Sequence, residues 1–272
     1  MSEPNTPDSQ SPHHVLLPIF PLTDVVLFPG MVLPLHIFEP RYQALMADIL
    51  PSTKSFGITL AESDEVVASS YPNPEEIRDP EQLHEEEEPV FIRRVKTARV
   101  GTIAQVVEHE PLEGGKMNII TVGTDRFVIE TIENSGETPY LKAYVTPFTD
   151  IIEQTPTDLA QIKRLQEAFT ELIRLNNKLQ GIDLTIKPLD EPVSLSFQVA
   201  QFLKGNPHLQ QELLELDSTG VRLRKEEEYL GLVNQKLAAW TQIEAAFEGV
   251  EGLSDEDTPR RNPYDNPDAP DS

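Results

Sequence analysis

The sequence has no cysteine, a single tryptophan and few basic residues. Without cysteine, the chain has no disulfide bonds, no thiolate nucleophile and no zinc site with cysteine ligands. Lysine and arginine total 22 against 46 aspartate and glutamate residues, which gives a formal net charge of −24 over 272 residues. This acidic balance argues against a protein that coats nucleic acid or an anionic membrane through its overall electrostatic field.

Long apolar runs are also lacking. The longest one, at 25–35, is interrupted by Pro29, Gly30 and Pro34, so we expect no membrane span. The first twelve residues lack both the cationic and the apolar region of a signal peptide. We therefore expect a cytoplasmic protein.

The acidic residues are concentrated in three segments. Residues 62–88 hold eleven acidic residues and one basic residue, Arg78, and both ends of the chain are acidic as well. Segments of this composition bury too little apolar surface to offset the loss of chain entropy on folding. We therefore expect disordered tails at 1–13 and 249–272 and a long acidic loop over about 62–98.

Residues 14–150 carry short, strand-like patterns. The apolar or alternating runs lie at 25–28, 56–60, 100–107, 117–122, 126–132 and 140–145, with glycine-containing turns at 112–116 and 134–136. Several strands joined by hairpins predict a small antiparallel barrel or curled sheet. One helix is expected to begin at Pro40, because apolar residues follow it at helical spacing.

Residues 155–248 carry helical patterns instead. A first helix is expected to begin at the cap residue Thr155 and to end near Gly181. Further helices are expected at 192–204, after Asn206, and after Ser218, where a long last helix of roughly 40 Å follows. Their apolar stripes predict a helical bundle, so the chain is expected to be an α+β protein.

Catalytic motifs are missing. The sequence contains no phosphate-binding loop, no H-E-x-x-H and no G-x-S-x-G. His109 lies between Glu108 and Glu110, which suggests a metal or acid–base site. Alternation along a strand places His109 on the opposite face from both glutamates, which favours a solvated strand edge. We expect no enzymatic activity and no catalytic, cofactor or metal site.

The most informative stretch is 16–46, which is dense in phenylalanine, proline and leucine. Rigid prolines that hold apolar side chains at a sheet edge suit the capture of an extended apolar peptide, by strand addition or in a groove. The alternative is that these side chains close the barrel and form its core. Around the helix start, Phe38, Arg41 and Tyr42 are expected to form a partly exposed cluster, and Glu39 is placed to cap the helix and hold Arg41.

These residues resemble the N-terminal substrate-binding domain of the Lon protease family in its stand-alone version. The matching runs are Leu17–Leu22, Val25–Gly30, Pro34–Leu35 and Ile37–Tyr42, and Val100–Ala104 and Gly123–Phe127 resemble the family's second and third signatures. The resemblance covers roughly residues 15–248. It implies an antiparallel PUA-like pseudo-β-barrel followed by a C-terminal helical bundle, without the ATPase and protease domains.

The resemblance also implies a function, namely a non-enzymatic module that binds exposed apolar or unfolded segments of other proteins. An adaptor or regulator of proteolysis is expected, with a protease or chaperone as a partner and no cofactor. The candidate peptide-binding or family-motif residues are Phe28, Pro29, Gly30, Pro34, Phe38, Glu39, Arg41, Tyr42, Gly101 and Arg126.

Two alternatives stay open. PUA-like barrels elsewhere bind RNA, and the charges of the predicted β core nearly cancel. Its basic residues are scattered, however, and the one cluster, at 93–96, lies beside an acidic run, so nucleic acid is not expected as a partner. The other alternative is a protein labelled an ATP-dependent protease through family association alone.

Overall fold

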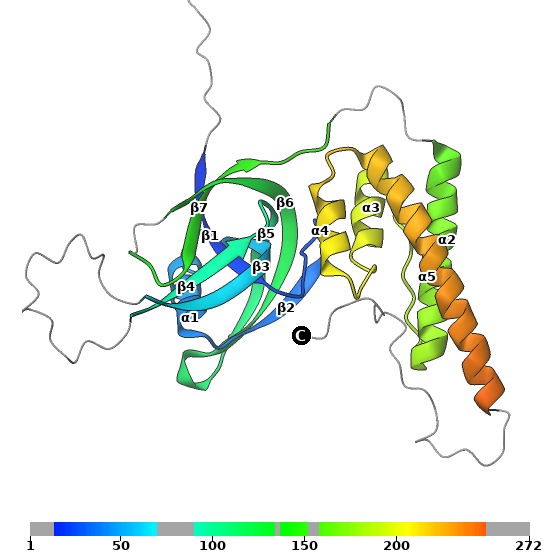
Figure 1. Cartoon of the computed structure of the whole chain (residues 1–272), viewed down its shortest axis with the longest axis horizontal. Coiled ribbons are helices and arrows are strands. Elements are labelled where there is room, and N and C mark those ends of the chain that lie inside the picture. Colours follow the sequence, from blue (N-terminus) through cyan, green and yellow to red (C-terminus); the bar gives the residue numbers. More distant parts are fainter. Residues whose placement is uncertain (1–13, 70–89, 134–136, 152–157, 249–272) are drawn as a thin grey trace, which may run out of the picture.

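The computed structural model describes residues 14–69, 90–133, 137–151 and 158–248. The predicted tails and the centre of the predicted acidic loop lie outside these residues. The chain forms a curled β-sheet with one helix packed on it, followed by a helical region that ends in a long helix (Figure 1). The predicted α+β class and the order of its two parts are therefore confirmed.

The sheet closes into a ring that stops short of a complete barrel. Its strands are β1 (Val15–Leu22), β2 (Val32–Ile37), β3 (Ser55–Ser69), β4 (Val90–Thr97), β5 (Val100–Pro111), β6 (Met117–Glu133) and β7 (Leu141–Pro147). The ring runs β1–β7–β6–β5–β3, and a parallel pairing of β1 with β3 closes it. The remaining pairings are antiparallel, and they attach β2 to β6 and β4 to β3 outside the ring.

Two expectations about the apolar runs differ from the structure, and a third concerns the acidic range. The run 25–28 is not a strand, and the carbonyl of Leu27 accepts a hydrogen bond from Thr102 Oγ1 at 2.6 Å. A short apolar run does not by itself distinguish a strand from a buried irregular segment. The runs 117–122 and 126–132 belong to one continuous strand, β6, because Gly123 pairs with Ala104 of β5 and keeps the strand extended between them.

The ends of the range 62–98, expected as part of a loop, are strands. β3 pairs with β4 from Ala61 opposite Thr97 to Ser69 opposite Val90. Both strands contain β-branched residues, which favour extended backbone. An acidic composition therefore does not exclude strands at the ends of this range.

The helical region consists of α2 (Leu159–Gln180), α3 (Pro192–Ala200), α4 (Pro207–Glu215) and α5 (Thr219–Glu248). The predicted cap at Thr155 lies outside the described residues, and α2 begins after Asp158, whose side chain accepts from the N–H of Ala160. Gly181 ends α2 in a left-handed conformation, and Ser218 Oγ accepts from the N–H of Val221 at 3.1 Å. The expected stop and the expected cap are thus confirmed, whereas α3 ends four residues before residue 204.

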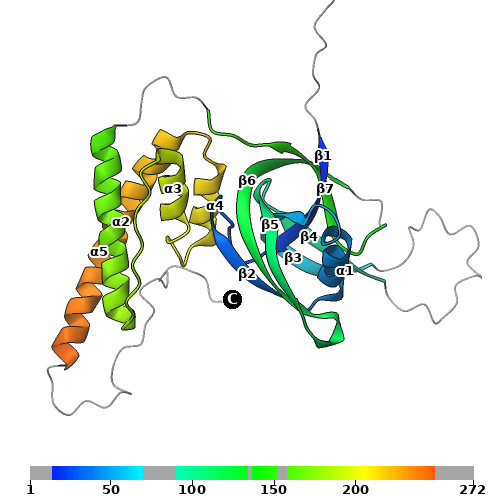
Figure 2. The same cartoon turned by 180° about the vertical axis from the view of Figure 1, so that it is seen from behind.

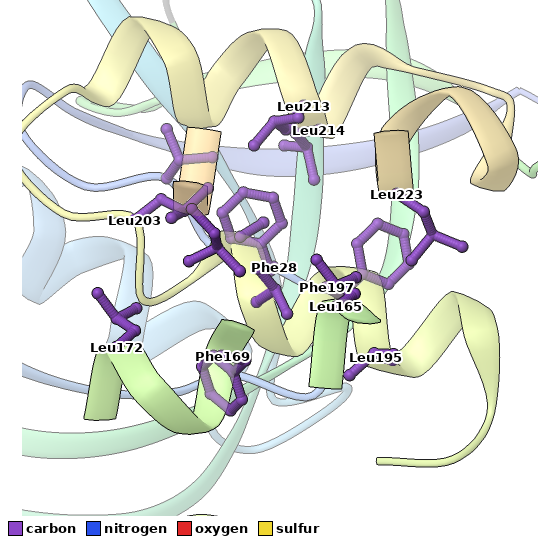
Figure 3. Close-up of a cluster of buried hydrophobic side chains, with 14 of the residues drawn as sticks. Phe28, Leu165, Phe169, Leu172, Leu195, Phe197, Leu203, Leu213, Leu214 and Leu223 are labelled. Carbon is purple, nitrogen blue, oxygen red and sulfur yellow. The ribbon is translucent and has the colours of Figure 1, made fainter. Parts of the chain in front are cut away.

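One hydrophobic core joins the sheet to the helices. Phe28 is fully buried and lies among leucine and phenylalanine side chains of the helices, with its ring centroid 6.3 Å from that of Phe197 (Figure 3). In addition, Gln211 Nε2 of α4 donates to the carbonyl of Val100 in β5 at 3.0 Å. The helical region is therefore packed directly against the sheet, with α4 next to the strands and the α2–α5 pair farther out (Figure 2).

A second core lies between the sheet and α1 (Pro40–Ile49). Tyr42 is buried and stacks on Phe20 of β1, with ring centroids 3.7 Å apart. Leu45, Met46 and Ile49 of α1 are buried in the same cluster. The helix expected to begin at Pro40 is confirmed, and it holds the chain that follows β2 against the sheet.

Candidate peptide-binding surface

One face of three adjacent strands carries exposed apolar side chains. Residues directly opposite each other on paired strands point to the same face of a sheet. β2 and β6 bring Val32 opposite Val122, Pro34 opposite Ile120 and His36 opposite Asn118, and β5 adds Gln105, Glu108 and Glu110 in the same three rows. We call these nine residues, together with the adjoining Phe38, the outer face.

The apolar part of the outer face lies on β2 and β6. Leu33 and Ile37 of β2 point into the core, so the alternate residues Val32 and Pro34 point away from it. Val32 is 59% exposed and Phe38, just after the strand, is 57% exposed, while Ile120 and Val122 are half-buried beside them. Exposed apolar side chains that adjoin one another in this way are typical of binding surfaces.

The row of His36, Asn118 and Glu110 is polar. His36 Nδ1 lies 2.8 Å from Asn118 Oδ1, and the amide of Asn118 in turn donates to Glu110 at 3.5 Å. The imidazole of His36 also stacks on the ring of Phe38, with centroids 5.9 Å apart. This row holds the aromatic ring of Phe38 at the end of the apolar strip.

The free edge of β2 carries Pro34. Among the described residues β2 pairs with β6 alone, and a proline inside a strand is confined to an edge because it has no N–H to donate. Such an edge is a poor template for a long added strand. Contact through the side chains of the outer face is therefore better supported than the strand addition that the sequence left open.

The cluster at the start of α1 is only partly exposed. Arg41 Nε donates to Glu39 at 2.9 Å, and its guanidinium carbon lies 4.3 Å from the centre of the Tyr42 ring. Glu39 holds Arg41 as predicted, but its side chain makes no capping hydrogen bond to the helix. Because Tyr42 is buried against Phe20, it supports the cluster from below and does not face a ligand.

Other candidate residues have structural positions. Phe28 is buried between the sheet and the helices, and the turn after it places Gly30 at a positive φ of 79°, with half-buried Pro29 before it. A side chain at Gly101 would meet the ring of Phe127 at 2.6 Å. Phe28 and Gly101 are thus part of the interior, whereas Gly30 lies in an exposed turn.

Arg126 is also buried, at the junction between the sheet and the helices. Its guanidinium donates to the carbonyls of Leu214 and Leu216 at 2.6 and 2.7 Å and forms an ion pair with Asp150. Burial lowers the pKa of Arg126, while the charge of Asp150 opposes this shift. Arg222 of α5 binds the same carboxylate, so two arginines share one acid.

Asp150 at this junction is held in its ionised form. Burial by itself raises the pKa of Asp150, but hydrogen bonds from Arg222 and Thr219 and the charges of the two arginines lower it overall. Sequence reasoning missed Asp150 and Arg222, since an isolated aspartate and an arginine within a helix carry no motif. It also missed Glu226, a fully buried residue of α5.

His109 occupies the position that strand alternation predicts. It lies opposite buried Ile119, whereas Glu108 and Glu110 lie opposite Ile120 and Asn118 on the outer face. Within the described ranges, no group of three histidine, aspartate or glutamate side chains is arranged to hold a metal ion. None of the helices in this part of the chain has the length and apolar character needed to cross a membrane.

The described residues thus combine a sheet closed in a ring, an exposed apolar face and a packed helical region. Residues 16–231 match the family described as the ATP-dependent protease La (LON) substrate-binding domain. Because this match covers most of the chain, the protein belongs to the Lon substrate-binding domain family.

Sequence relatives of the chain include Lon proteases. The Lon protease of Aquifex aeolicus is 27% identical over 216 residues, which cover 78% of this chain and 24% of the relative. The Lon protease of Xanthomonas oryzae pv. oryzae is 27% identical over 250 residues, covering 89% and 26% of the two chains. The chain thus spans about a quarter of the length of these relatives, and their remaining parts are not covered.

One solved structure supports the same fold, and a second is less similar. The N-terminal domain of a Mycobacterium avium complex Lon protease is similar with a TM-score of 0.53 and 18% identity, covering 80% of this chain and 98% of that one. A Lon N-terminal domain protein from Xanthomonas campestris has a TM-score of 0.48 and 20% identity, covering 78% and 96%.

Proposed function

We propose that the outer face binds exposed apolar segments of other proteins. The observation that carries this proposal is the strip of Val32, Pro34, Ile120, Val122 and Phe38, which is held on a rigid sheet and accessible to solvent. Family membership supports it, because the matching domain is described as substrate-binding. An unfolded segment exposes apolar side chains that a folded protein hides, so such a strip distinguishes the two.

We further propose that the chain acts without catalysis of its own, as an adaptor or regulator of proteolysis with a protease or chaperone as its partner. The family match covers a substrate-binding domain, and the sequence contains no phosphate-binding loop. We expect the purified chain to leave casein intact with or without ATP. Co-purification of a protease or chaperone from the native cell would support the adaptor role, and its repeated absence would count against it.

The binding proposal is tested with a fluorescently labelled apolar peptide whose affinity is measured by anisotropy. The double variant Val32→Ser Phe38→Ser should weaken binding at least about tenfold, because central apolar contacts carry most of the energy of an interface. The matched control is Leu16→Ser Tyr144→Ser. These two residues form an exposed cross-strand pair on β1 and β7, away from the outer face, with exposures of 43% and 42%.

Equal loss of affinity in both double variants would overturn the assignment to the outer face. Absence of binding to any apolar peptide would overturn the function itself. Circular dichroism and urea unfolding of each variant confirm that the compared proteins are folded.

A further inference from the structure

Two carboxylates border the apolar strip of the outer face. Glu108 of β5 lies in the row of Pro34 and Ile120, and Glu110 lies in the row of His36 and Asn118. Both glutamates are exposed. Adjacent strands are about 5 Å apart, so the two carboxylates stand within about 10 Å of the β2 side chains, across β6.

Within the part of the chain that the structure describes, these carboxylates have no lysine or arginine partner. Among the described residues, no lysine or arginine forms an ion pair with Glu108 or Glu110, although eight other such pairs are present. Arg41, at the start of α1, pairs with Glu39. Glu113 and Lys116 lie at the tip of the hairpin between β5 and β6, and their opposite charges cancel. The border of the strip therefore stays negative.

We infer that the preferred partner is an extended segment whose apolar residues are flanked by lysine or arginine. This inference rests on the proposed function and names the class of segment that the outer face selects. A peptide advances about 3.3 Å per residue, so a basic residue a few positions beyond an apolar one reaches β5 while the apolar side chain stays on β2 and β6. Acidic flanks would meet like charge at the same border.

The inference is tested with three peptides that share one apolar core and carry two lysines, two glutamines or two glutamates as flanking residues. The lysine peptide should bind about 3- to 10-fold more tightly than the glutamine peptide, since each exposed ion pair contributes little. The glutamate peptide should bind most weakly. The differences should shrink between 50 mM and 500 mM salt, because salt screens exposed charges.

The double variant Glu108→Gln Glu110→Gln should abolish the preference for lysine flanks, so that the lysine and glutamine peptides bind to it with similar affinity. The matched control, Glu167→Gln Glu244→Gln, removes the same charge from exposed positions on α2 and α5. It should keep the preference. This control is needed because a chain with a net charge of −24 attracts cations everywhere.

The outcomes separate the two proposals. If the three peptides bind equally, or if both double variants lose the preference alike, the charge selection is wrong while apolar binding stands. If none of the peptides binds, the proposed function fails and this inference fails with it. Sedimentation of a dimer that Val32→Ser Phe38→Ser dissociates would show a second copy of the chain on the outer face, which would overturn the inference.

Discussion

Asp150, which follows the last strand of the sheet, accepts a hydrogen bond from Nη2 of Arg222 in α5 at 2.7 Å. The same carboxylate binds Arg126 of β6, and Arg222 Nε also donates to Ser196 of α3 at 2.7 Å. The acid thus connects the sheet to α5, and Arg222 extends the connection to α3. Together with Phe28, it fixes the helical region against the ring of strands.

We predict that Asp150→Asn lowers the free energy of unfolding by about 3–5 kcal/mol, because it leaves two buried arginines without their counter-charge. Urea unfolding at pH 7 measures the loss. Glu171→Gln, which breaks an exposed ion pair with Arg174, is the control and should change the stability by about 1 kcal/mol or less. A similar effect of both changes would show that the junction contributes no more than a surface pair.

The same junction predicts an acid dependence. The pKa of Asp150 is lowered in the folded state, so its contribution is present above the ordinary carboxylate pKa of about 3.9 and is lost as the pH falls through the lowered value. Unfolding curves between pH 6 and pH 2 should therefore differ in slope between the native chain and Asp150→Asn. Parallel curves would contradict the prediction.

Glu226 predicts the opposite pH dependence. Its side chain is completely buried, and neither carboxyl oxygen has a hydrogen-bond partner among the described residues. Burial raises the pKa of Glu226 well above its ordinary value, although the charge of Arg222 opposes the shift. The unfolded chain releases this proton first, so stability is highest below the ordinary pKa and falls as the pH rises toward the raised pKa.

We therefore predict that Glu226→Met raises the free energy of unfolding at pH 8 by about 1–4 kcal/mol and removes this part of the pH dependence. The exposed neighbour Glu228 provides the control, and Glu228→Gln should leave the pH profile unchanged. A destabilised Glu226→Met protein at pH 8 would mean that the buried carboxyl is needed for packing.

Two glycines predict opposite effects of the same substitution. Gly101→Ala should lower the free energy of unfolding by about 2 kcal/mol or more, because the new methyl group would overlap the carbonyl of Ile58 and lie 2.6 Å from Phe127. Gly231, inside α5, has no described atom within 4 Å of the added carbon. Gly231→Ala should raise stability by about 0.5–1 kcal/mol, since alanine favours the helix. Thermal unfolding of both variants checks the difference in sign.

Two phenylalanines of the candidate set predict separate effects on folding and binding. Phe28→Ala should cost about 3–5 kcal/mol of stability, because it leaves a cavity between the sheet and the helices. Phe38→Ala should change stability by about 0.5 kcal/mol or less and weaken only peptide binding, because its ring is mostly exposed. Loss of stability in Phe38→Ala would place it in the fold and not in the site.

Local signals of the sequence determined the helices and most strands of this protein. Pro40, Gly181 and Ser218 mark helix ends through backbone restrictions and hydrogen bonds that act within a few residues, and alternation placed His109 correctly. Local signals also explain two wrong predictions, the strand expected at 25–28 and the loop expected at 62–69. An apolar run or an acidic composition does not specify which strand, if any, pairs with the segment. The order of motifs also sufficed to indicate the family.

Only the tertiary structure decided which candidate residues face solvent. Phe28, Tyr42 and Arg126 belong to family motifs, as Pro34 and Phe38 do, yet they are buried because distant segments pack over them. The rows that join β2 to β5 across β6 depend on strand register, which is set by the contacts of the whole sheet. Asp150 acquires its role in the same way, since its two arginines come from elements far apart in the chain.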